Sequence, residues 1–158
     1  SHPRNRKFDS MSNLGIEAFT IRVYGILEKD QQILLSRENI YGGVYTKFPG
    51  GGLEFGEGTI DCLKREFMEE CQLNINVDEH FYTTEDFVPS AFSNKMQVMS
   101  IYYRVSCDDL SPLLHRTAPS KFEKHGDQDL IWKKLEELNP HELNLPIDRL
   151  VAEKLLAS

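Results

Sequence analysis

The chain has 158 residues, 40% of them hydrophobic, and a mean hydropathy of −0.44, which is typical of a soluble globular protein. Its formal net charge of −7 disfavours long nucleic acids as partners, because their binding depends on contacts between phosphates and Lys or Arg. No apolar run approaches the roughly 18–20 residues of a membrane span, and no signal peptide is recognisable, so we expect no membrane partner.

The chain is expected to hold one folded domain. Residues 1–13 are polar, basic and without periodicity, and we interpret them as a disordered arm or a remnant of the expression vector. Residues 14–158 then form a single domain. Cys62, Cys71 and Cys107 make no C-x-x-C pair and sit within apolar patterns. Reduced, mostly buried thiols are therefore expected, which favours a cytoplasmic location.

The first strands are indicated by alternating β-branched and aromatic residues. Such alternation predicts a strand over residues 16–28, a turn at Lys29-Asp30 and a returning strand over residues 32–36. Residues 45–48 form a further short segment that leads into the glycines at 50–52.

That glycine turn bears on ligand binding. Three residues without Cβ let the backbone approach a ligand closely. The dinucleotide pattern G-x-G-x-x-G fails because Phe55 replaces its third glycine, and a P-loop fails because Glu57 and Gly58 replace its Lys and Ser/Thr. Because the acidic Glu57 replaces the phosphate-binding lysine, the sequence indicates that phosphate is bound through a bridging cation.

A helix follows the turn, with Thr59 as its expected N-cap. At about 100° per residue, Glu66, Glu69 and Glu70 fall within roughly 100° of one another on one helical face. Clustered carboxylates invite a hard cation, Mg²⁺ or alternatively Mn²⁺, rather than zinc. An apolar stripe beside this face can pack on a core; its members are Ile60, Leu63, Phe67 and Cys71.

The remaining elements complete an α/β pattern. Strands are predicted over residues 80–88, 97–107 and 130–134, and a last helix opens at Pro146. Strands on both sides of one helix, with a second helix at the end, predict a mixed β-sheet sandwiched between helices.

The segment from Gly51 to Leu73 resembles the Nudix hydrolase signature, G-x5-E-x7-R-E-U-x-E-E-x-G-U, where U is a bulky apolar residue. The matching positions are Gly51, Glu57, Arg65, Glu66, Phe67, Glu69, Glu70 and Leu73. One position departs, because Gln72 stands where the family has a glycine that ends the helix in a left-handed conformation. A glutamine there costs up to about 1–2 kcal/mol, unless Asn74 takes over the cap.

The resemblance extends loosely from Ile16 to Leu156 and implies the α/β/α Nudix fold. It also implies metal-dependent hydrolysis of a nucleoside diphosphate linked to another group. The metal ligands it implies are Glu66, Glu69 and Glu70, with the backbone carbonyl of Gly50. Glu66 is the preferred general base, assisted by Arg65 and by Glu57 through a metal-bound water, and Gly51 and Gly52 are expected to contact substrate.

In parts of the family the base lies on a later loop. The corresponding residues here are Glu123, Asp127 and Asp129, and His125 beside them could contact phosphate. Among the aromatic residues, one or two are expected to face a substrate pocket and stack on a base. They come from the set Tyr82, Phe87, Phe92, Tyr102, Tyr103 and Trp132.

Three functions stay open. Pro89, about sixteen residues beyond the signature, resembles a proline of Nudix enzymes that act on ADP-ribose and favours an ADP-sugar-like substrate. The alternatives are a nucleoside triphosphate pyrophosphatase of the nucleotide pool and a catalytically silent ligand-sensing module. For either hydrolase function, the binding partner is expected to be a small nucleotide-type substrate. The sequence also permits a homodimer.

Overall fold

The structure is a computed structural model that describes residues 15–117 and 121–158, so the arm predicted over residues 1–13 lies outside the described residues. In chain order the elements are β1 (Ala18–Lys29), β2 (Gln32–Ile40), β3 (Gly43–Lys47), β4 (Gly50–Gly52), α2 (Thr59–Cys71), β5 (Ile75–Thr83), β6 (Met96–Cys107), the 3-10 turn η1 (Ser111–His115), β7 (Gln128–Lys134), the 3-10 turns η2 (Leu135–Glu137) and η3 (Pro140–Glu142), and α3 (Pro146–Ala157). No helix within the described ranges is long and apolar enough to cross a membrane.

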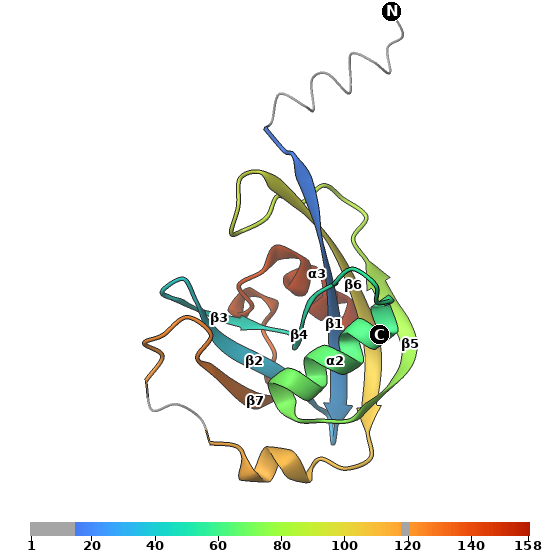
Figure 1. Ribbon diagram of the computed structural model, residues 1–158. Helices are drawn as coiled ribbons and strands as arrows, with labels where there is room; N and C mark the ends of the chain where they lie inside the picture. Colours follow the sequence, from blue (N-terminus) through green and yellow to red (C-terminus); the bar gives the residue numbers. More distant parts are fainter. Residues whose placement is uncertain (1–14, 118–120) are drawn as a thin grey trace, which may run out of the picture.

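The seven strands form one mixed sheet in the order β3-β2-β1-β6-β5, with β4 paired to β1 and β7 paired to β2. β1 and β6 run parallel over a long register, from Ala18 opposite Met96 to Leu27 opposite Val105. The other pairings are antiparallel. Figure 1 shows β1 running through the middle of the molecule, where it meets both β6 and the short glycine strand β4.

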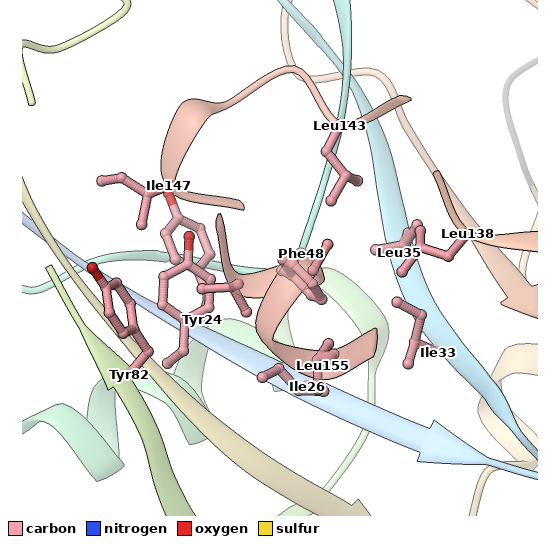
Figure 2. Packing of buried hydrophobic residues seen from close by; sticks show 13 residues of the cluster. Tyr24, Ile26, Ile33, Leu35, Phe48, Tyr82, Leu138, Leu143, Ile147 and Leu155 are labelled. Atoms are coloured by element: carbon pink, nitrogen blue, oxygen red, sulfur yellow. The ribbon is translucent and has the colours of Figure 1, made fainter. Parts of the chain in front are cut away.

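The two long helices cover opposite faces of the sheet, which confirms the predicted sandwich. Val23 and Leu27 of β1 pack into the cluster that contains Phe67 of α2, whereas the alternate residues Tyr24 and Ile26 pack into the cluster that contains α3. Figure 1 shows α2 crossing the sheet on the side opposite α3. Figure 2 shows the second cluster, with Tyr24, Phe48 and Leu155 gathered between the strands and α3.

A buried polar group ties α3 to the sheet. Asp148, in the first turn of α3, is fully buried and accepts hydrogen bonds from the Tyr102 hydroxyl and, at 3.2 Å, from the Phe48 N–H. Burial raises the pKa of Asp148 to about 6, although these hydrogen bonds and the nearby Lys47 oppose the shift. Lys47 is itself 1% exposed, donates to the Phe48 carbonyl at 3.1 Å and lies over the Tyr24 ring.

Two local expectations were wrong. The fifth strand covers Ile75–Thr83 rather than residues 80–88, because the chain pairs with β6 directly after α2 and beyond Thr83 keeps only an isolated bridge from Pro89 to Gln97. The N-cap of α2 is Gly58 rather than Thr59, whose hydroxyl instead bonds the Tyr103 hydroxyl at 2.7 Å.

Candidate active site

The glycine strand β4 lies directly under two glutamates of α2. The Gly50 N–H donates to Glu70 Oε2 at 3.3 Å, and a Cβ on Gly51 would lie 2.3 Å from Glu66 Cδ. Gly50 has φ +147°, and a Cβ there would lie 2.1 Å from the Val23 carbonyl oxygen. The absence of side chains on β4 therefore lets this strand pack against β1 while both carboxylates reach its backbone.

Glu70 is a largely buried carboxylate whose pKa is shifted upward. Burial raises its pKa to about 7, and the neighbouring Glu66 and Glu38 raise it further, whereas Lys47 and the Gly50 N–H lower it. Glu38 of β2 also lines the adjoining cleft, so the acidic charge extends beyond the helix. Negative charge gathered in a largely buried place is stabilised when a cation binds beside it.

Arg65 connects the other acidic residues. It donates from Nε and Nη2 to both oxygens of Glu57, at 3.0 and 2.6 Å, and from Nη1 to Glu66 Oε1 at 2.8 Å. Nη1 also donates to the exposed Glu69 at 3.2 Å, and Nη2 donates to the Gly52 carbonyl at 3.0 Å. Hydrogen bonding from Arg65 lowers the pKa of Glu57 to about 2, so Glu57 stays ionised and anchors the guanidinium that orients Glu66.

The C-terminal end of α2 is held by a residue that the sequence analysis missed. Gln72 occupies the left-handed cap with φ +56°, so the cap has not moved to Asn74. Arg116 donates to the Glu70 carbonyl at 2.6 Å and to Gln72 Oε1 at 3.2 Å, while its Nη2 donates to Gln128 of β7 at 3.2 Å. The negative C-terminal end of the helix dipole also stabilises a cation at this position. No spacing signal in the sequence marks Arg116. Two of its partners, at the end of α2, lie more than forty residues earlier in the chain, and the third lies on β7.

The donor set fits a hard divalent ion. Within residues 15–117 and 121–158, no three His, Cys, Asp or Glu side chains surround a common point closely enough to enclose an ion. Mg²⁺ does not need such a cage, because it keeps several waters and commonly uses one or two carboxylates. Glu66 and Glu70 flank β4 with oxygen donors. Burial disfavours the ionised form of Glu70, and a bound cation would offset that cost and favour the carboxylate.

A cleft of ≈ 640 Å³ is lined by Arg22 and Glu38, whose charges interact with Glu70, whereas Glu66 and Glu70 are not part of its lining. Its floor includes Arg22 and Tyr24 of β1 and Tyr102 of β6. Arg22 Nε donates to the Tyr24 hydroxyl at 3.1 Å. Although burial lowers the pKa of Arg22, the charges of Tyr24, Glu66 and Glu70 raise it overall, which places this guanidinium between the cleft and the acidic site. Arg22 lies in a strand pattern with no motif, and sequence reasoning did not single it out.

The later acidic residues lie away from the cleft lining. Asp127 accepts from the backbone N–H groups of Glu123 and Lys124, and Asp129 accepts from the N–H of its own neighbour, Leu130. Glu123 is exposed and forms a long ion pair with Lys121 at 3.9 Å. From this loop the cleft is lined by His125.

Besides Tyr24, three aromatic residues line the cleft. Phe92 and Tyr102, both among the predicted aromatic residues, line it, whereas Tyr82 is part of the core on the α3 side. Tyr41 lines it as well and was missed, because a tyrosine in a tight Tyr-Gly-Gly turn carries no recognised ligand motif. His125 and Pro89 complete this part of the lining.

The comparisons with known proteins bear on the family and the fold. A family model described as the NUDIX domain matches residues 18–154. No curated protein matches the chain. Among solved structures, the fold is similar to a NUDIX hydrolase from Nitrosomonas europaea, with a TM-score of 0.67 and 19% identity over 87% of this chain and 88% of that one. It is also similar to a MutT NUDIX hydrolase from Burkholderia pseudomallei, with a TM-score of 0.63 and 18% identity over 88% of this chain and 99% of that one.

A third similar structure is entitled UDP-X diphosphatase; its TM-score is 0.58, with 17% identity over 98% of this chain and 68% of that chain. At these identities the likeness concerns the fold. The family match covers most of the chain, and the glycine strand, the acidic helix and the connecting arginine lie together in space. The chain therefore belongs to the Nudix hydrolase superfamily and is a pyrophosphohydrolase.

Proposed function

We propose that this enzyme is metal-dependent and cleaves the diphosphate bond of a nucleoside diphosphate linked to another group, with an ADP-sugar as the favoured substrate. The observation that carries the proposal is the position of Glu66 and Glu70 over β4, beside a cleft whose floor presents Arg22. A site that combines clustered acids with one arginine suits a diphosphate that brings a cation with it.

The ion would be Mg²⁺, or alternatively Mn²⁺, held by Glu66, Glu69 and Glu70 with the carbonyl of Gly50. When bound, such an ion neutralises charge on phosphoryl oxygens and makes coordinated water more acidic. Arg22 would contact the diphosphate from the cleft floor, and the backbone at Gly51 and Gly52 would lie along the substrate.

The protein's own side chains provide the proton chemistry. Glu66, oriented by Arg65, accepts a proton from the attacking water as the new P–O bond forms and the bridging P–O bond breaks. Glu57 acts through Arg65 as a positioning residue, because its two oxygens are both engaged by the guanidinium. A role for Glu123, Asp127 or Asp129 as the base would require the loop to rearrange, since Asp127 is bonded within its own turn.

Pro89 supports a substrate with a group on each side of the diphosphate. It lies sixteen residues beyond Leu73, as in relatives that act on ADP-ribose, and it lines the cleft. The structure entitled UDP-X diphosphatase shares this fold, which is compatible with a nucleoside diphosphate derivative. A nucleoside triphosphate substrate stays the second candidate.

A nucleotide panel tests the proposal. The enzyme is incubated with ADP-ribose, UDP-glucose and nucleoside triphosphates, with Mg²⁺ or EDTA, and products are resolved by chromatography. Release of AMP from ADP-ribose only with Mg²⁺, without pyrophosphate from triphosphates, is expected. Pyrophosphate release from triphosphates would favour the second candidate, and inactivity on the whole panel would favour a ligand-sensing role.

We also propose a cytoplasmic location and a small-molecule partner, with a homodimer as the assembly to be tested by light scattering. The three cysteines support the location, because all three are free thiols and Cys62 and Cys71 are buried.

A further inference from the structure

A lysine ammonium is buried next to the glycine strand. Lys47, the last residue of β3, is 1% exposed and pairs with the buried Ser36 of β2. Its Nζ donates to the Phe48 carbonyl at 3.1 Å and lies 5.4 Å from the centroid of the Tyr24 ring. Lys47 is not part of the cleft lining, so its charge serves a purpose other than direct contact with a substrate in that cleft.

The ammonium of Lys47 lacks the partners that a buried charge normally has. An ammonium carries three N–H donors, and among the described residues Lys47 makes one side-chain hydrogen bond and no ion pair. The face of the Tyr24 ring offsets part of the cost of burial. A lysine is rarely buried so completely without a carboxylate bound to it. Such a residue is expected where the function, and not the stability of the fold, requires the charge.

The hydrogen bond of Lys47 holds the backbone that leads into β4. The Phe48 carbonyl accepts from Lys47, while the Phe48 N–H donates to Asp148 at 3.2 Å. Two residues further along the chain, the Gly50 N–H donates to Glu70 Oε2 at 3.3 Å. Lys47 therefore fixes the start of the strand that lies under the carboxylate of Glu70.

The charge of Lys47 also acts on two buried carboxyl groups, Glu70 of α2 and Asp148 of α3. Burial raises the pKa of both groups, and the charge of Lys47 lowers both. The Asp148 carboxyl is already held by hydrogen bonds from Tyr102 and Phe48. Among the groups that lower the pKa of Glu70, Lys47 has the largest effect. Glu70 therefore depends on Lys47 more than Asp148 does.

We propose that Lys47 is the internal counter-ion of the acidic site and a positioning residue for it. Its ammonium offsets the carboxylate of Glu70 and, through the Phe48 carbonyl, holds the start of β4 beside that carboxylate. The inference rests on the proposed function and deepens it. Because Lys47 and a divalent ion are both cations, Lys47 keeps the site assembled between binding events and weakens the binding of the ion. The enzyme is thus built to exchange its ion rather than to retain it.

Lys47→Met tests the proposal, because a counter-ion and a purely structural lysine predict opposite effects on ion binding. Methionine keeps a long unbranched side chain without the charge. MgCl₂ alone is titrated into the full chain at about pH 8.5, where carboxylates are ionised, and binding is followed by calorimetry. The variant is expected to bind Mg²⁺ about fivefold more tightly or better, because a repelling charge is removed. A lysine that served packing alone would leave the affinity unchanged or, when replaced, weaken it.

Two further variants separate charge, hydrogen bonding and stability. Lys47→Gln removes the charge but keeps an N–H donor for the Phe48 carbonyl, so tighter Mg²⁺ binding is expected here as well. It takes the place of Lys47→Met if that variant does not fold. Leu143→Ala is the matched control, because Leu143 is fully buried in the cluster on the α3 side and its truncation lowers stability without a change of charge. Its Mg²⁺ affinity should equal that of the wild type.

The outcomes distinguish the inference from the proposed function. Unchanged or weaker Mg²⁺ binding in a folded Lys47 variant would overturn the inference, and hydrolysis of ADP-ribose by the wild type would still support the proposed function. Tighter binding in Leu143→Ala would also overturn the inference, because loss of stability alone would then explain the effect. Tighter binding confined to the Lys47 variants, in a protein that hydrolyses nothing on the nucleotide panel, would support the counter-ion and overturn the proposed function.

Discussion

The carboxylate of Glu66 lies against the backbone of Gly51, where an added Cβ would come within 2.3 Å of Glu66 Cδ and 2.4 Å of Glu66 Oε2. The nearest atoms all belong to the mobile end of one side chain, so Gly51→Ala should fold normally and displace Glu66. Small misplacements of reacting groups can cost about 10²-fold in rate. We therefore expect kcat/KM to fall by about that factor while the free energy of unfolding changes by less than about 1 kcal/mol.

Gly50→Ala provides the contrast. A Cβ at this position would lie 2.1 Å from the Val23 carbonyl oxygen and 2.7 Å from Tyr24 Cα, which are backbone atoms, and φ is +147°. We expect a loss of unfolding free energy of about 3 kcal/mol or more, measured by urea denaturation. If Gly51→Ala kept full activity, or destabilised the protein as much as Gly50→Ala, the proposed contact between Glu66 and β4 would not matter for catalysis.

Arg65→Lys should separate charge from geometry. A lysine keeps the positive charge but cannot bind both oxygens of Glu57 while also reaching Glu66. Loss of such a supporting contact typically costs about 10–100-fold in activity, and we expect kcat rather than KM to change.

Glu57→Gln is the partner variant for this prediction, because Glu57 and Arg65 act through the same pair of hydrogen bonds. The double variant should lose about as much activity as the worse single variant, as expected for coupled residues. Losses that multiply would show that Glu57 has a separate role, such as the contact to a metal-bound water that the family resemblance implies.

The sequence predicted the parts of the site that local spacing determines. The periodicity of Leu63, Phe67 and Cys71 placed α2 with one face on the core, and the glycines of β4 indicated a close backbone approach. The prediction that Ile60 belongs to the same apolar stripe was wrong: Ile60 lies in the first turn of α2 and is exposed.

The predicted ends of elements were wrong where a long-range contact determines them. The Thr59 hydroxyl, for example, bonds the Tyr103 hydroxyl of β6 instead of capping α2. Likewise β5 begins at Ile75 because pairing with β6 starts there.

The residues that were missed depend on the tertiary structure. Arg22 sits in an ordinary strand pattern, and only the pairing of β1 with β4 and β6 brings it to the cleft and the acids. Arg116 reaches the end of α2 across 46 residues, and Tyr41 meets His125 across 84. A single sequence contains no spacing rule for such contacts, so the composition of a cleft is harder to predict than a signature helix.

Glu70→Gln should remove a pH dependence as well as activity. Burial raises the pKa of Glu70 from 4.5 to about 7, so the folded protein holds this proton more tightly than the unfolded chain does. The contribution of Glu70 to stability is therefore fully present below about pH 4.5 and is lost as the pH rises to 7, amounting to roughly 3 kcal/mol.

In Glu70→Gln this slope should disappear, folding should be maintained and turnover should collapse. Thermal unfolding from pH 4 to 8, without metal and with Mg²⁺, measures the effect. In the wild type, stabilisation by Mg²⁺ should grow as the pH rises through 7, because the ionised carboxylate binds the ion. Equal Mg²⁺ stabilisation in the variant and the wild type would remove Glu70 from the metal ligands.

Asp148→Asn should act on the fold, because Asp148 is fully buried and, within the described chain, has no direct contact with the carboxylates of α2. Burial raises the pKa of Asp148 from 3.8 to about 6, so this group also contributes most at low pH, and its contribution falls by roughly 3 kcal/mol between about pH 4 and pH 6. The amide can still accept the Tyr102 hydroxyl but carries no charge. Measured in a Glu70→Gln background, where the slope near pH 7 is removed, the wild-type Asp148 should leave a fall in stability as the pH rises from about 4 to 6, which Asp148→Asn abolishes. A slope that persists in the double variant would mean that another group, and not the carboxylate joining α3 to Phe48 and Tyr102, controls the acid range of stability.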